Sequence, residues 1–104
     1  MNNFRRNQMI IVTATITANP DERDKIIKKS QDLIESTRLE SGCISYNLYA
    51  STEDDNILLM LERWENQEVL ESHMQTKHFK AFGADIKNLL ARKLDIDVCS
   101  ADKI

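Results

Sequence analysis

The stretch ILLMLERW, residues 57–64, decides the fold, because it is apolar on both faces of a strand. Side chains alternate between the two faces of a β-strand, so every second residue shares a face. Each face carries three large apolar side chains: Leu58, Met60 and Trp64 on one, and Ile57, Leu59 and Leu61 on the other. A sheet that contains this strand therefore needs an apolar cover on each side.

The preceding segment, residues 43–50, also alternates and predicts another strand. Residues 51–56 between the two strands are polar and acidic, which is typical of a hairpin connection. The two strands are therefore expected to pair antiparallel. The faces of the earlier strand are expected to divide its side chains into Ile44, Tyr46 and Leu48 on one side and Cys43, Ser45, Asn47 and Tyr49 on the other.

The first part of the chain predicts a strand followed by a helix. Residues 9–18 are rich in Ile, Val and Thr, which favours a strand. The next residues are typical of a helix start, with Asn19 at the N-cap, Pro20 at the first helical position and Glu22 at the third. The Asn and Glu side chains can accept from the free N–H groups there, and Pro loses no hydrogen bond. We expect a helix that begins there and packs one apolar face on the sheet.

A second helical region and a last strand complete the pattern. Asn66 can cap this region, whose apolar pattern restarts after Thr76, so two helical pieces are expected, with Gly83 as a weak point for a kink. Residues 93–98 alternate and predict a fourth strand. The order βαββαβ with right-handed crossovers predicts a ferredoxin-like α+β fold with an antiparallel sheet.

Helices in such a fold cover only one face of the sheet. The apolar residues on the other face of segment 57–64 still need a partner, because large exposed apolar patches are rare on soluble monomers. The simplest partner is a second copy of the same sheet, packed face to face with two-fold symmetry. The sequence therefore predicts a homodimer.

Length and composition limit the class of protein. The chain has 104 residues, 41% hydrophobic and 30% charged, so we expect a single domain over residues 9–104 after a flexible extension over residues 1–8. No apolar run approaches the roughly 20 residues of a membrane helix. A net charge of -3 with interspersed signs predicts no nucleic-acid partner. Two cysteines and no recognisable signal peptide favour the cytoplasm.

The sequence contains no motif for a metal or a nucleotide cofactor. His73 and His78 are five residues apart, which separates them by about 140° on a regular helix, so they are not expected to face one metal. Gly42 and Gly83 are the only glycines, so no glycine-rich phosphate loop is present. Cys43 lies within a predicted strand, where packing is the ordinary role of a cysteine. We expect no metal and no cofactor.

A candidate cavity lies between the predicted helices and the sheet. Trp64 ends one strand and His73 lies on the following helix, so the two side chains could close on a common space. Glu62 shares a face with Met60 and Trp64 and is a candidate for a partly buried acid. Packing is the competing interpretation, with Trp64 as a core or interface residue and His73 as a half-buried helix residue.

Several pieces of the sequence, taken in order, resemble the antibiotic biosynthesis monooxygenase family. They are ESGCISYNLY (40–49), ERW (62–64), LESH (70–73) and KHF (77–79), and the similarity runs from about Met9 to about Val98. The resemblance implies a homodimer whose sheets meet in a dimeric α+β barrel. It also implies oxidation of a phenol, hydroquinone or similar electron-rich ring by O2, with no metal or flavin.

On this resemblance, His73 would be the catalytic base or a group that orients the substrate. His78 is expected to be structural or solvated, because it lies on another helix face beyond the expected kink. Met60 stands where quinol-forming members carry an Asn. The side chains expected to contact a small aromatic or quinone-like substrate are Trp64, Tyr46, Met60, Glu62, Met74 and Phe79. Three functions stay open: a cofactor-independent monooxygenase, a small-molecule isomerase or lyase, and a non-catalytic binding or regulatory dimer.

Overall fold

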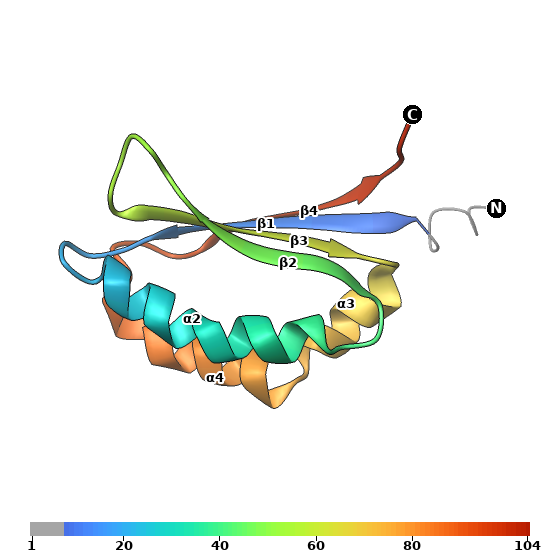
Figure 1. The fold of residues 1–104 in the computed structure, drawn as a ribbon, viewed down its shortest axis with the longest axis horizontal. Coiled ribbons are helices and arrows are strands. Elements are labelled where there is room, and N and C mark those ends of the chain that lie inside the picture. Colours follow the sequence, from blue (N-terminus) through green and yellow to red (C-terminus); the bar gives the residue numbers. More distant parts are fainter. Residues whose placement is uncertain (1–7) are drawn as a thin grey trace.

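The computed structural model describes residues 8–104, which form a four-stranded antiparallel sheet and a layer of helices (Figure 1). The spatial order of the strands is β2-β3-β1-β4, so the predicted βαββαβ order and the ferredoxin-like α+β fold are confirmed. Of the expected flexible extension, residues 1–7 lie outside the described part. The elements are β1 (Met9–Thr17), α2 (Arg23–Arg38), β2 (Cys43–Ala50), β3 (Ile57–Trp64), α3 (Gln67–Met74), α4 (Lys77–Ile86), the short 3₁₀ helix η1 (Lys87–Leu89) and β4 (Asp95–Ala101).

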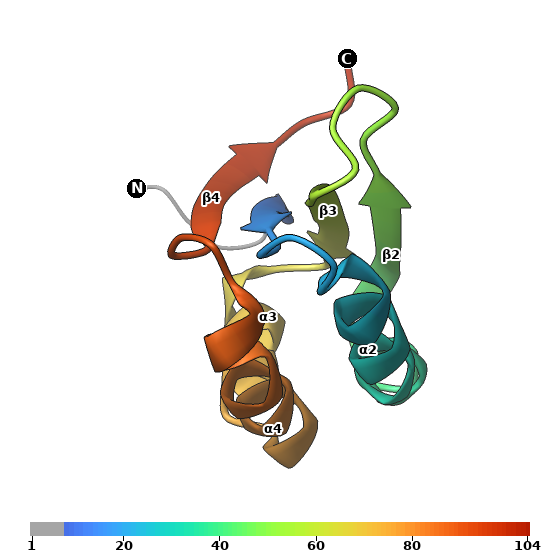
Figure 2. The same ribbon diagram turned by 90° about the vertical axis from the view of Figure 1, so that its left-hand side faces the viewer.

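All the helices lie on one face of the sheet (Figures 1 and 2). Helices α2 and α4 pack side by side, and α3 continues the layer below the end of β3 (Figure 1). No element within residues 8–104 covers the opposite face. No helix in this range is long and apolar enough to cross a membrane. The sheet therefore presents one covered face and one open face.

Alternating residues of the two central strands fill the core beneath the sheet. Strand β1 buries every second side chain, and β3 does the same, because the helices cover only one face of each strand. The core has two adjoining parts. The larger contains Ile10, Val12, Ala14, Leu33, Ile34, Tyr46, Met60, Trp64 and Leu70, and the smaller contains Ile16, Ala18, Ile26, Leu58 and Ile86.

The open face confirms that segment 57–64 is apolar on both sides. Leu59 and Leu61 lie on this face and are only partly buried, whereas Leu58 and Met60 are fully buried under the helices. Across the sheet, Leu61 pairs with Thr13 of β1 and with Asn47 of β2. The open face is therefore mixed, with an apolar centre on β3 and hydroxyl or amide side chains beside it.

The first helix begins three residues later than the sequence predicted. Helix α2 starts at Arg23, and Glu22 stands at its N-cap without a side-chain hydrogen bond. The backbone N–H groups of Ala18 and Asn19 are engaged outside any helix of their own, since they donate to the carbonyls of Asn56, before β3, and of Leu89, in η1. The next residues must therefore turn the chain toward the helix layer, and Asp21 does so with a φ of 67°.

A β-bulge makes the predicted facing of strand β2 wrong at its start. The register shifts between Cys43 and Ser45, so that Cys43 opposes Trp64 and packs against the core. Ile44, expected to share a face with Tyr46, is the extra residue of the bulge and is half exposed. Tyr46 itself is buried, as its place in the alternation predicted.

The two helical pieces after β3 are confirmed, and they separate at Thr76, where the apolar pattern restarts. Helix α3 is capped as predicted by Asn66, whose Oδ1 accepts from the Val69 N–H at 3.0 Å. Thr76 caps α4 by accepting the Phe79 N–H, so the chain changes direction between Met74 and Lys77. Gly83 lies inside α4, where the helix continues. The last strand begins at Asp95, two residues later than expected.

Candidate active site

A pocket of about 360 Å³ lies between the sheet and the helices α3 and α4. Its walls are mostly apolar and include Val12, Met60, Leu70 and Phe82. The side chains of Met74, Phe79, Ile96 and Val98 also line it and are partly exposed, so the pocket is open at these residues. Its ionisable lining groups are Tyr46, Glu62, His73 and Lys80. A largely apolar pocket with a few converging polar groups is typical of a small-molecule site.

His73 is packed within an aromatic cluster at the wall of this pocket. It lies in the last turn of α3 and is 1% exposed. Its ring stacks at a tilt on Trp64, with 4.6 Å between centroids, and meets the edges of Phe79 at 5.1 Å and Tyr46 at 5.5 Å. Three rings from β2, β3 and α4 therefore hold the imidazole in one orientation.

A carboxylate joins His73 to the second histidine. Oε2 of Glu40, in the connection between α2 and β2, lies 2.8 Å from Nδ1 of His73 and 2.5 Å from Nε2 of His78. The expectation that the two histidines could not face one metal ion is therefore wrong as geometry, because their ring nitrogens and the Glu40 carboxylate lie within 4.8 Å of one another. It assumed one regular helix, whereas the chain turns between α3 and α4 and brings both rings to Glu40.

The burial of His73 changes its protonation. Burial lowers the pKa of the imidazole, because the charged form loses its hydration, while the hydrogen bond and the charge of Glu40 oppose this effect. Nδ1 faces Glu40, and Nε2 is buried without a hydrogen-bond partner within residues 8–104. At neutral pH the ring is therefore neutral and has one ring nitrogen that is not engaged by the rest of the described chain.

Glu62 is a second buried ionisable group in the pocket. It is 6% exposed, and its Oε1 accepts a hydrogen bond from Nε1 of Trp64 at 3.0 Å. Burial raises the pKa of the carboxyl, the hydrogen bond from Trp64 lowers it and the charge of Glu40 raises it, so that the pKa lies at about 7. A carboxyl group with a pKa near neutrality can gain or lose a proton during catalysis.

Tyr46 supplies a neutral hydroxyl group to the same wall. It is buried, and its pKa is raised far above the ordinary value, first by burial and then by the charges of Glu62 and Glu40. The phenol of Tyr46 therefore stays protonated at neutral pH. It can donate a hydrogen bond to an anion that forms in the pocket.

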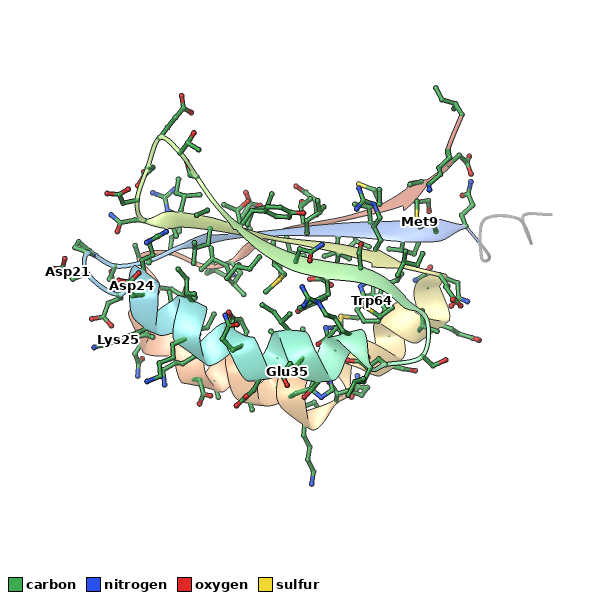
Figure 3. All side chains as sticks on the ribbon, in the orientation of Figure 1. Met9, Asp21, Asp24, Lys25, Glu35 and Trp64 are labelled. Carbon is green, nitrogen blue, oxygen red and sulfur yellow. The ribbon has the colours of Figure 1, made fainter. Side chains whose placement is uncertain are left out.

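Six of the seven side chains that the sequence singled out line the pocket. The seventh, Trp64, contacts His73 and Glu62 but is fully buried between the sheet and the helices, at the end of the molecule where α3 lies (Figure 3). Trp64 therefore supports the site instead of lining it. The predicted side chains that do line the pocket are Tyr46, Met60, Glu62, His73, Met74 and Phe79.

Glu40 is the main residue that sequence reasoning missed. It lies 33 positions before His73 and follows a helix, in a turn where acidic side chains are ordinary. Lys80 of α4, which also lines the pocket, was missed because its position reads as a solvated face. Neither residue carries a local pattern that would connect it to His73.

The chain belongs to the antibiotic biosynthesis monooxygenase family, whose model matches residues 9–85. "Uncharacterized protein sll1783" of Synechocystis is 38% identical over 89 residues, which are 86% of this chain and 60% of that protein. "Probable quinol monooxygenase YgiN" of Escherichia coli is 29% identical over 90 residues, 76% of this chain and 86% of that protein. A solved structure described as a "putative antibiotic biosynthesis monooxygenase" from Caulobacter crescentus has a TM-score of 0.89 and 28% identity, and the match covers 97% of this chain and 96% of that one.

Proposed function

We propose that this protein is a cofactor-independent monooxygenase that oxidises a small phenol or hydroquinone with O2. The observation that carries the proposal is the apolar pocket lined by the buried, neutral His73, whose Nε2 has no hydrogen-bond partner within residues 8–104. The family and the name of the quinol monooxygenase relative support the reaction class. The apolar lining supports a ring-shaped substrate.

The proposed reaction begins with a proton transfer. Nε2 of His73 takes the proton of a substrate hydroxyl, so an O–H bond breaks, an N–H bond forms and an electron-rich phenolate is left. A ring carbon of the phenolate then forms a bond to O2, which accepts two electrons from the ring, and the proton on Nε2 of His73 moves to the outer oxygen to give a hydroperoxide. Cleavage of the O–O bond, with loss of the proton on the same ring carbon, gives the oxidised product, and the released hydroxide takes up that proton as water. For a hydroquinone, one O2 then yields one hydroxyquinone and one water. Tyr46 can donate to the developing anion, and the apolar walls exclude solvent.

An isomerase or lyase is the second candidate, and the protonation state of Glu62 favours it. A carboxyl with a pKa near 7 and a neutral imidazole in one pocket can move a proton between two substrate atoms without any oxidant. A binding or regulatory dimer would use the same pocket without chemistry. These two functions predict no consumption of O2.

The oligomeric state belongs to the same proposal. The open face of the sheet has its apolar centre at Leu59 and Leu61, and a second copy can cover it face to face. We therefore propose a homodimer in which two sheets form an α+β barrel. We also propose a cytoplasmic location, which fits the free thiols of Cys43 and Cys99.

An oxygen electrode and a panel of hydroquinones and anthrones test the proposed function. Protein treated with a chelator should consume O2 only in the presence of a suitable substrate. Conversion of the substrate under anaerobic conditions would instead support the isomerase or lyase. Saturable binding without turnover by any member of the panel would support the binding module and contradict the monooxygenase.

A further inference from the structure

We propose that Glu40 is a positioning residue that fixes the tautomer of His73, and that His78 holds the Glu40 carboxylate from the outer side. The proposal concerns the base assigned to the pocket and so rests on the proposed function. It adds two residues to the site, neither of which lines the pocket. Their effect on the substrate would pass through His73 alone.

The geometry of the cluster runs from the core toward solvent. The side chain of His73 is 1% exposed, that of Glu40 is 15% exposed and that of His78 is 25% exposed. The backbone around Glu40 is fixed by two hydrogen bonds: its N–H donates to Thr37 at 3.0 Å, and its carbonyl accepts from Cys43 at 3.3 Å. The carboxylate is therefore held between the two rings by a defined turn.

The chemistry of a carboxylate determines where the ring protons lie. An ionised carboxylate oxygen can only accept hydrogen bonds, so both nitrogens that face Oε2 of Glu40 must carry protons. His73 is then protonated on Nδ1 and His78 on Nε2. This leaves Nε2 of His73 with a free lone pair. Nε2 is the buried atom without a partner in residues 8–104, and it is the one that can accept a proton from a substrate.

The charge of Glu40 has a second effect during the reaction. When Nε2 accepts a proton, a positive imidazolium forms in a buried place, which burial disfavours. The Glu40 carboxylate, 2.8 Å away, stabilises this cation, whereas a charged His78 opposes it. The titratable groups that face His73 are Glu40 from the α2–β2 connection, His78 of α4 and Tyr46 of β2, while its contacts Trp64 and Phe79 are uncharged.

A divalent cation is the competing occupant of the cluster. The donor atoms of Glu40, His73 and His78 lie within 4.8 Å of one another. The two nitrogen–oxygen separations, 2.8 and 2.5 Å, are hydrogen-bond lengths. They are shorter than the roughly 3.3 Å that separates two ligands of a tetrahedral zinc ion with bonds of about 2.0 Å. The geometry therefore favours shared protons over a shared metal.

Imidazole ¹⁵N NMR of the full chain tests the proposal without any substrate. Wild-type His73 should carry its proton on Nδ1. Glu40→Gln keeps an acceptor but loses the charge, so it should keep this tautomer and lower the pKa of His73 by about one pH unit or more. Glu40→Ala loses both properties and should mix the tautomers. Glu71→Gln, on the exposed side of α3, is the matched control and should change neither.

Oxygen uptake provides the second measurement. Glu40→Gln should lower kcat by about tenfold or more with little change in KM, and it should shift the acidic limb of the pH profile together with the pKa of His73. If NMR confirms the tautomer but no substrate consumes O2, the proposed function fails and the positioning role stands.

Several results would overturn the proposal. A proton on Nε2 of wild-type His73 would do so, and this measurement needs no variant to fold. An unchanged pKa of His73 in Glu40→Gln would do so as well. One equivalent of bound Zn²⁺ that a chelator removes, with a matching change in both histidine spectra, would replace the shared protons by a metal site.

Discussion

Two buried ionisable side chains with opposite pKa shifts lie in one apolar pocket. Burial lowers the pKa of His73 and raises that of Glu62 to about 7, because in both cases the charged form loses its hydration. Near pH 7 His73 is therefore neutral, whereas Glu62 is about half protonated, and either group can exchange a proton. The contacts around His73 make it the better base, since Glu40 stabilises its charged form, whereas the Trp64 N–H, which donates to Glu62 within residues 8–104, favours the carboxylate and makes it a weaker base.

Replacing His73 tests its role as the base. His73→Phe keeps an aromatic ring between Trp64 and Phe79 but removes both nitrogens, so turnover should fall by at least about tenfold, as expected for the loss of general-base catalysis. The melting temperature of the variant should be close to that of the wild type. His78→Ala, which contacts Glu40 but not the pocket, should reduce turnover much less. Equal effects of the two substitutions would leave His73 with a packing role only.

The raised pKa of Glu62 predicts a pH-dependent stability. Its carboxyl has a pKa of about 7 in the folded chain and 4.5 in its ordinary state, so folded protein retains a proton that unfolded protein releases. This contribution to stability is fully present below about pH 4.5 and is lost as the pH rises through about 7. The shift corresponds to about 3 kcal/mol.

Glu62→Gln should therefore be more stable than the wild type above pH 7, by up to about 3 kcal/mol, and should lose most of this advantage near pH 5. Urea unfolding at pH 5 and pH 8 measures the difference. Glu65→Gln, an exposed position nearby, should behave like the wild type at both values. The same free-energy change for Glu62→Gln at both pH values would contradict the assigned pKa.

At the scale of elements, periodicity predicted the strands well and their irregular ends less well. Buried and partly exposed side chains alternate along β1 and β3 as predicted, because the helices cover only one face of each strand. The bulge at Ile44 and the turn at Asp21 depend on how the chain leaves one layer and enters the next, which no local alternation encodes. The break at Thr76 is a capping feature, and it changes which helix face His78 occupies.

The two glycines make a matched test of the connection that carries Glu40. Gly42 has a φ of 88°, and a Cβ there would lie 2.6 to 2.7 Å from three side-chain atoms of Val69 in α3. Gly42→Ala should therefore destabilise the protein by more than about 1 kcal/mol. Gly83→Ala, inside α4 with nothing within 4 Å, should stabilise it by about 0.5–1 kcal/mol. Chemical unfolding measures the free energy of unfolding of both variants. A Gly42→Ala variant as stable as the wild type would show that Val69 moves away and contradict the predicted cost.

The whole molecule has a covered face that holds the pocket and an open face that the proposed dimer would bury. Leu61→Arg places a charge at the apolar centre of the open face, where burying an unpaired charge costs several kcal/mol, so this variant should be monomeric or aggregated. Leu39→Arg is the matched control, because Leu39 is 88% exposed at the end of α2. Sedimentation velocity at micromolar concentration should show a dimer for the wild type and for the control. A wild-type monomer would remove the dimer from the proposal.

The site residues that could be predicted are those that lie on neighbouring elements of the sequence. Tyr46, Met60 and Glu62 could be placed together because neighbouring strands align them on one face. His73 followed from its position on the next helix. Glu40 could not be placed beside His73, since the contact depends on the turn after α2 and on the break between α3 and α4. Trp64 lies at the end of β3, as predicted, but it is fully buried and does not line the pocket.

Isotope labelling with ¹⁸O₂ tests the central claim most directly. Chelator-treated protein without added metal or flavin should convert a hydroquinone or an anthrone into a product that contains one oxygen atom from O2, and the other atom should appear in water. His73→Phe should form less labelled product, in proportion to its lower turnover. An unlabelled product, or activity that returns only when a metal or a flavin is added, would contradict the assignment of this pocket to cofactor-independent oxygenation.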